Sequence, residues 1–203
     1  MARGTTSMPS GATTYFPFHY HYRKERAGEQ MGDPVRLSGD DAQGQRSMST
    51  PDYIASLPTK RMAAGALFFN ADKEILIVQP TYRESWLVPG GVVEAHESPR
   101  VACRREVREE LGLDVPLGRL LCVEYRSPAP PSTESLQFIF AGGILSPDSI
   151  RQITLPAREL SAFCFVTPDE AMRRLGARLG RRIQLALTAL HEERTVYAED
   201  GVE

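Results

Sequence analysis

Residues 91–113 read GVVEAHESPRVACRREVREELGL, a polar loop followed by a segment with helical periodicity. Within that segment Glu106, Glu109 and Glu110 are three and four residues apart, which places three carboxylates on one side of the predicted helix. Glu97 adds a fourth acid just upstream. Like charges at these spacings destabilise a helix by roughly 0.2–0.5 kcal/mol per pair. The concentration of acids therefore calls for a compensating function.

An apolar stripe adjoins the acids and is predicted to seat the helix on a sheet. Its members are Cys103, Val107 and Leu111. At the border of a buried face, carboxylates raise one another's pKa unless a cation neutralises them. Oxygen ligands suit Mg²⁺ or Mn²⁺, so we predict a metal site. The alternative is a solvated acidic face in which Arg105 pairs with Glu109, but it leaves Glu97, Glu106 and Glu110 unexplained.

The chain after residue 60 predicts an α/β fold in which a sheet has helices on both faces. Alternating or short apolar runs predict the strands. They are RMAAGALFF (61–69), KEILIVQP (73–80), GRLLCVEY (118–125), SLQFIFAGGIL (135–145) and SAFCFV (161–166). Ser98, followed by proline, predicts the start of the acidic helix and Gly112 its end. Apolar residues at helical spacing over 172–190 predict a last helix, with breaks at Gly176 and Gly180.

The stretch 91–113 is similar to the Nudix box, and WLVPGG before it resembles that family's usual lead-in. The fixed positions of the box are filled by Gly91, Glu97, Arg105, Glu106, Glu109, Glu110 and Gly112. The likeness in strand order extends over residues 61–194. It implies a Nudix-type α/β/α sandwich with a mixed sheet between helices, a domain over residues 48–194 and a C-terminal tail over residues 195–203.

The resemblance also implies an enzyme that uses Mg²⁺ or Mn²⁺ to hydrolyse the pyrophosphate linkage of a nucleoside diphosphate derivative. A nucleoside triphosphate or an ADP-ribose-like compound is the expected substrate. The implied metal ligands are Glu106, Glu110, the carbonyl of Gly90, and Glu109, which either joins them or holds a metal-bound water. The implied base is either a box glutamate such as Glu106, with Glu109 beside it, or Glu159 on a later loop. The implied supporting residues are Glu97 and Arg105, which orient the cluster, and Gly91 and Gly112, which set backbone geometry.

Composition places the chain among globular proteins of a reducing compartment. It has 203 residues, 41% hydrophobic and 25% charged, with a formal net charge of −2 that gives no bulk attraction to nucleic acid or membrane. Its three cysteines have neither disulfide nor zinc-site spacing, and no apolar run approaches the ~20 residues of a membrane span. We therefore predict a cytoplasmic protein, with residues 1–47 as a disordered arm and Met48 as a candidate natural start.

Two features outside the box leave a second function class open, a nucleotide-sensing regulatory protein without turnover. One is an arm segment, TTYFPFHYHYRKER (13–26), where a run of aromatic side chains lies beside basic ones. The other is a run of arginines near the end, which forms either a solvated helix face or a phosphate-binding surface. Its members are Arg173, Arg174, Arg178, Arg181 and Arg182. The complete carboxylate set favours the enzyme. Because Nudix proteins are often dimeric, the resemblance leaves a homodimer open as well.

Overall fold

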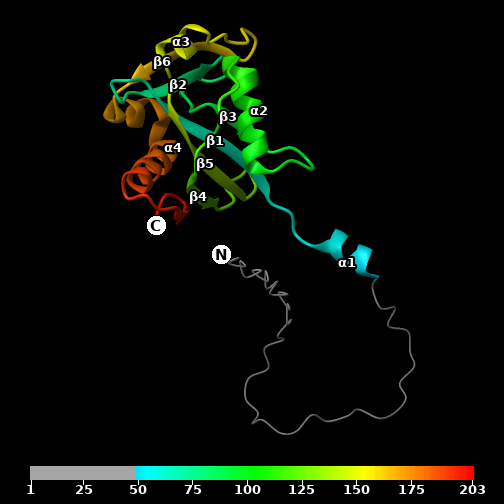
Figure 1. Cartoon of the computed structure of the whole chain (residues 1–203). Helices are drawn as coiled ribbons and strands as arrows, with labels where there is room; N and C mark the ends of the chain where they lie inside the picture. The colour runs from blue at the N-terminus through cyan, green and yellow to red at the C-terminus, as the bar shows by residue number, and fades with distance from the viewer. Residues whose placement is uncertain (1–48) are drawn as a thin grey trace, which may run out of the picture. The chain divides into compact units, whose positions relative to one another are not determined.

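The computed structural model describes residues 49–203, and the predictions for residues 1–47 and Met48 lie outside that range. This part of the chain consists of helices and strands. The strands build one mixed sheet, and the two longer helices pack on it (Figure 1). In chain order they are α1 (Thr50–Ser56), β1 (Arg61–Phe69), β2 (Ile75–Pro80), β3 (Gly90–Val92), α2 (Pro99–Leu111), β4 (Leu120–Arg126), β5 (Ser135–Ile144), α3 (Pro147–Arg151), β6 (Leu160–Val166), α4 (Pro168–His191) and β7 (Val196–Glu199).

The sheet runs in the order β6-β2-β1-β5-β4-β7, and β3 pairs with β1 beside this path. The β1·β5 and β4·β7 pairs are parallel, whereas the remaining pairs are antiparallel. The tight β1–β2 connection follows from Asn70, whose side-chain oxygen accepts hydrogen bonds from the amides of Asp72 and Glu74. Because β3 pairs with β1, the centre of the sheet holds β3 in place.

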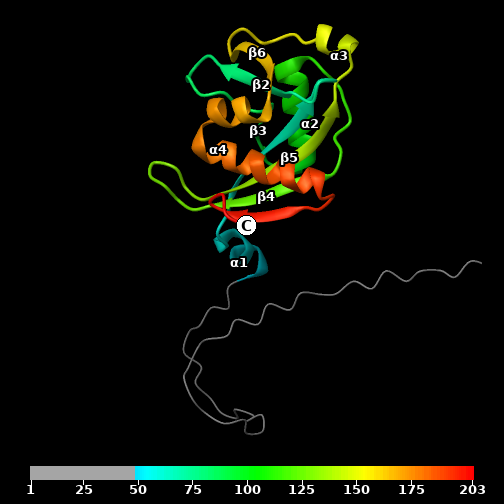
Figure 2. The same ribbon diagram turned by 90° about the vertical axis from the view of Figure 1, so that its left-hand side faces the viewer.

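Both faces of the sheet are covered, because the side chains of β1 and β2 alternate between two hydrophobic cores. Leu67 and Ile75 belong to the core under α4, whereas Phe68 and Leu76 belong to the core under α2. Figures 1 and 2 show α2 and α4 on opposite sides of the strands. The predicted α/β/α sandwich with a mixed sheet is confirmed.

The two main helices begin and end for reasons visible in the sequence. Ser98 caps the N-terminus of α2 by accepting from the Val101 amide, and Gly112 ends the helix in the left-handed conformation at φ 70°, as predicted. Helix α4 breaks at Gly176, with φ 74° and ψ 164°, but not at Gly180. A Cβ at Gly180 would lie 3.1 Å from the Met172 carbonyl oxygen, so this glycine serves close packing within the bent helix.

The prediction of a tail over residues 195–203 requires correction. Val196 and Ala198 are fully buried, and β7 extends the sheet by pairing in parallel with β4. The strand is only four residues long, which is too short for an alternating pattern to identify it. Among residues 49–203, no helix combines the length and the apolar character needed to cross a membrane.

Candidate active site

The site is built where β3 meets β1. Gly90 pairs with Gly65, and Gly91 with Ala64, in an antiparallel ladder of three residues. Gly90 has φ +141°, and a Cβ at this position would lie 2.2 Å from the Ala64 carbonyl oxygen. No side chain fits there, so the glycine permits the close approach of the two backbones. The proline-glycine turn before α2 is thereby fixed against the centre of the sheet.

The acidic side of α2 lies directly on this glycine pair. A Cβ on Gly91 would lie 2.4 Å from the Glu106 carboxyl carbon, so the absence of a side chain makes room for that carboxylate. Glu110 accepts a hydrogen bond of 2.8 Å from the amide of Gly90. The glycines therefore position two carboxylates through backbone contacts that a larger residue would obstruct.

Arg105 joins the other box acids. Its guanidinium donates to both carboxylate oxygens of Glu97, at 2.9 and 3.0 Å, and to Glu106 at 2.9 Å. It also donates to Glu109 at 3.0 Å and to the Val92 carbonyl at 3.0 Å. The fork geometry of the guanidinium suits this task, and lysine could not make the same set of bonds. Arg105 therefore ties α2 to the loop that precedes it.

Burial divides the three helix acids. Glu110 is only 8% exposed, and this burial raises its carboxyl pKa to about 8, with the charges of Glu106, Glu159 and Glu109 adding to the shift. Burial also raises the pKa of Glu106, again with help from Glu109 and Glu159. Glu109 is more open to solvent. We expected mutual repulsion to perturb the acids, and the structure shows that loss of hydration is the larger cause.

Glu159 comes to this cluster from a distant part of the chain. It lies in the turn before β6, where its carbonyl accepts a 2.9 Å hydrogen bond from the Thr81 amide at the end of β2. Its charge raises the pKa of both Glu106 and Glu110, so its carboxylate faces the same region. The sequence-predicted acids therefore converge, although no contact selects Glu106 or Glu159 as the base.

The donor set suits a hard divalent cation. Glu110 is a buried carboxylate whose only partner in the described chain is the Gly90 amide, and carboxylates of this kind favour oxygen-loving ions. Within residues 49–203, no three acidic, histidine or cysteine side chains already enclose an ion position. Glu106 and Glu109 instead contact Arg105. Arg105 contacts one oxygen of each of these two carboxylates, so the other oxygen of each would be available to an ion.

A cleft of about 720 Å³ opens over Gly90 and Gly91. This volume is within the range of small-molecule sites. Its walls come from β1, β3, β5 and the kinked part of α4, with Tyr82 exposed at the rim and Phe138 on the sheet. Five arginines line it, and no acidic side chain does. They are Arg61, Arg83, Arg126, Arg178 and Arg182.

The arginines on the cleft walls are candidate binding residues that sequence reasoning largely missed. Arg61, Arg83 and Arg126 lie on separate segments, so no local pattern links them. Of the predicted run on the last helix, Arg173 and Arg174 pair with Glu170, and Arg174 also stacks on Trp86. These two support the structure. Arg182 lines the cleft but is buried against Glu124, whereas Arg178 and Arg181 line cavities without an ion pair among the described residues.

The sandwich, the glycine-carboxylate arrangement and the basic cleft together define an α/β protein in which an acidic helix lies beside an arginine-lined cleft. The family model for the NUDIX domain matches residues 59–186, which is more than half of the chain. The chain belongs to the Nudix family.

Two curated relatives and one solved structure illustrate the range of similar proteins. The 8-oxo-dGDP phosphatase NUDT18 of Danio rerio is 43% identical over 67 residues, 32% of this chain and 21% of that protein. Diphosphoinositol polyphosphate phosphohydrolase 2 of Rattus norvegicus is 44% identical over 61 residues, 29% of this chain and 34% of that protein. The matches thus span only 21% and 34% of these relatives' own lengths. A crystal structure of UDP-X diphosphatase, with a TM-score of 0.57 and 23% identity, covers 76% of this chain and 77% of that one and shares the fold.

Proposed function

We propose that this protein is a divalent-metal-dependent hydrolase that cleaves the pyrophosphate linkage of a nucleoside diphosphate derivative or a related phosphate anhydride. The observation that carries the proposal is the buried carboxylate of Glu110. It is held by the amide of Gly90, a residue that itself lines the arginine-rich cleft. A carboxylate kept this dry without a cationic partner costs stability, which an ion-binding role explains.

Glu106, Glu109, Glu110 and the Gly90 carbonyl would hold Mg²⁺ or Mn²⁺. Bound there, the ion would acidify a water molecule and screen the diphosphate charge. Arg105 and Glu97 orient the carboxylates, and the arginines of the cleft bind the phosphate oxygens. Glu159 or Glu106 takes the proton from the attacking water. The oxygen of that water forms a bond to phosphorus as the bridging oxygen departs on the other phosphate.

The relatives suggest the substrates to be tested. A release assay should compare 8-oxo-dGDP, a diphosphoinositol polyphosphate, a nucleoside triphosphate and ADP-ribose, each with Mg²⁺ and with Mn²⁺. In water labelled with ¹⁸O, we expect one product phosphate to gain a single labelled oxygen, seen by ³¹P NMR. Metal-dependent binding of these compounds without any product would instead identify a nucleotide sensor.

A further inference from the structure

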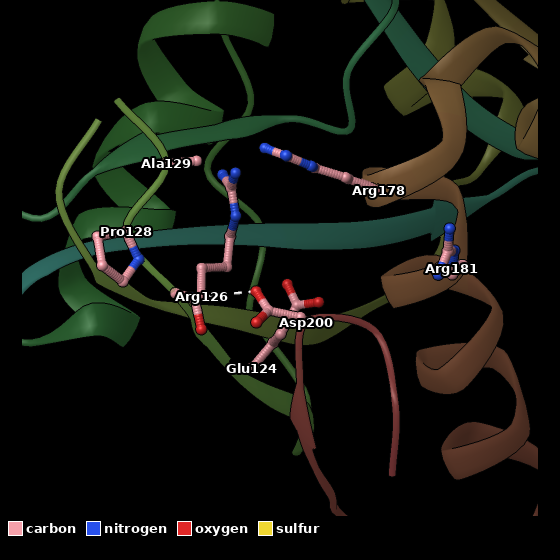
Figure 3. A pocket seen from close by; sticks show the side chains of 8 residues that line it. Glu124, Arg126, Pro128, Ala129, Arg178, Arg181 and Asp200 are labelled. Carbon is pink, nitrogen blue, oxygen red and sulfur yellow. Dashed lines mark hydrogen bonds between the residues drawn. The ribbon is translucent and has the colours of Figure 1, made fainter. Parts of the chain in front are cut away.

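A second cavity, of about 320 Å³, adjoins the cleft where β4 ends (Figure 3). The two hollows share Arg126 and Arg178 in their walls, so they are adjacent. The remaining lining comes from the loop after β4, from Arg181 on α4 and from Asp200 after β7. The cavity therefore extends the cleft away from the carboxylates of α2.

The arginines of this cavity lack the acidic partners that other arginines of the protein have. Within residues 49–203, neither Arg126 nor Arg178 forms an ion pair, although Arg126 is half-buried. Figure 3 shows both side chains extending into the same space. The charge of Arg126 also lowers the pKa of Arg182, after the larger effect of burial. Two guanidinium groups that converge repel each other unless an anion lies between them.

Two carboxylates face the cavity, but they do not balance the charge of its three arginines. Glu124 is buried and paired with Arg182. Asp200 accepts a 3.0 Å hydrogen bond from the Ser127 amide, and its pKa is lowered by Ser127 first and then by Arg126 and Arg178. With Arg181 also lining the cavity, positive charge remains in excess.

The kink in α4 delivers Arg178 to this position. Gly176 has φ 74°, and a Cβ there would meet no atom within 4 Å. Backbone conformation, rather than packing space, therefore explains the glycine. After the break, the first turn of the second helical segment, residues 176–179, lines the cleft. The fold thus bends a helix at the point where its arginine reaches the shared wall.

We propose that the cavity between Arg126 and Arg178 binds a further phosphate group of the substrate, separate from the diphosphate that is cleaved. The compound cleaved would then be a diphosphate whose attached moiety carries at least one further phosphate. The inference rests on the proposed function for the position of the scissile diphosphate, but anion binding in the cavity can be tested without turnover. Paired guanidinium groups recognise phosphate by parallel hydrogen bonds, which explains two arginines in place of one.

The binding test uses metal-free protein and two probes, inositol hexakisphosphate and inorganic diphosphate, measured by isothermal titration calorimetry at low salt. We expect wild type to bind the hexakisphosphate more tightly. Arg178→Ala and Arg126→Ala should each weaken this binding roughly tenfold, the effect of one lost charged hydrogen bond. Arg178→Lys should recover part of the loss. The matched control is Arg173→Ala, on the same helix but paired with Glu170 outside both cavities.

Equal losses in Arg173→Ala and Arg178→Ala would overturn the proposal, because they would indicate attraction to overall charge alone. So would preference for diphosphate, or no hexakisphosphate binding by wild type. Because Arg126 is half-buried, thermal unfolding of Arg126→Ala is compared with that of wild type. If Arg126→Ala does not fold, Arg178→Ala is the decisive variant, because Arg178 is exposed.

Kinetics separate this inference from the proposed function. We expect Arg178→Ala to raise KM for a diphosphoinositol polyphosphate more than for ADP-ribose, lowering the ratio of the two kcat/KM values at least about tenfold. Equal effects on both substrates would overturn the second phosphate site while leaving the hydrolase intact. Hexakisphosphate binding that depends on Arg178 in a protein that hydrolyses nothing would support the cavity and refute the hydrolase.

Discussion

Glu110 and Glu124 are both buried carboxylates, yet only Glu124 has a cationic side chain beside it. Glu124 is 2% exposed and paired with Arg182 under α4, whereas Glu110 is 8% exposed and receives a single hydrogen bond from the Gly90 amide. The charge of Glu124 is neutralised by Arg182 within the fold. Glu110, whose pKa burial raises to about 8, has no cationic side chain beside it in the described residues. The difference fits a structural role for Glu124 and the proposed cation-binding role for Glu110.

The largest expected effect separates the two acids by activity. Glu110→Gln should lower kcat/KM on the order of a thousandfold, about 4 kcal/mol, because it removes a proposed metal-binding charge. The fold should remain, since the amide keeps the shape of the side chain. Metal-dependent product release measures the effect, with Glu193→Gln, an exposed acid after α4, as control. Near-normal turnover by Glu110→Gln would remove the distinction between the two sites.

Breaking the internal pair should mainly affect stability. Arg182→Met leaves Glu124 buried without its cation and should lower the free energy of unfolding by about 3 kcal/mol, measured by urea denaturation. The double variant Glu124→Leu with Arg182→Met removes both charges and should recover most of that loss. If the single variant were as stable as wild type, the pair would not be the self-contained counterpart of Glu110.

The pH dependence of metal-free protein should reveal Glu110 directly. Its folded-state pKa of about 8 exceeds the ordinary value of 4.5, so the folded state binds the proton more tightly. The contribution of Glu110 to stability should therefore be greatest below pH 4.5 and decline by roughly 1–4 kcal/mol as pH rises from 4.5 to 8. Urea unfolding with a chelator, at several pH values, should show a flatter curve for Glu110→Gln. Parallel curves would contradict the assignment.

We expect the smallest effect on stability at an exposed ion pair, which serves as a reference for the two buried acids. Asp148 and Arg151 form an ion pair at the surface of α3, with both side chains at least 70% exposed. Arg151→Ala should change the free energy of unfolding by no more than about 0.5 kcal/mol, because water screens such pairs. A loss comparable to that of Arg182→Met would mean that burial is not what distinguishes the two regions.

Local patterns predicted most of the sandwich and the acidic half of the site. The helix caps at Ser98 and Gly112, the break at Gly176 and the main strands each depend on a few neighbouring residues. The basic half depends on long-range contacts. Arg126 and Arg178 are brought together by the pairing of β4 in the sheet and by the kink in α4, which no spacing in the sequence encodes. β7 was missed because four residues carry too little pattern.

The extent to which Glu110 is buried could not be predicted from the sequence either. The spacing of Glu106, Glu109 and Glu110 indicated repulsion, but only the packing of α2 on the sheet shows that Glu110 loses most of its water. Such an acid is identified by its burial from solvent, and that burial depends on the neighbouring glycines and on the β1·β3 pairing. Long-range packing also determines the position of Glu159 near the acids of α2, because its turn is hydrogen-bonded to Thr81 at the end of β2.

The most direct test of the central claim is a titration of purified protein with Mn²⁺, followed by electron paramagnetic resonance of the free ion. We expect wild type to bind Mn²⁺, more tightly with a diphosphate compound present, and Glu110→Gln to bind it at least about tenfold more weakly. Absence of Mn²⁺ binding with and without the diphosphate compound, or equal binding by both proteins, would contradict the view that Glu110 awaits a cation.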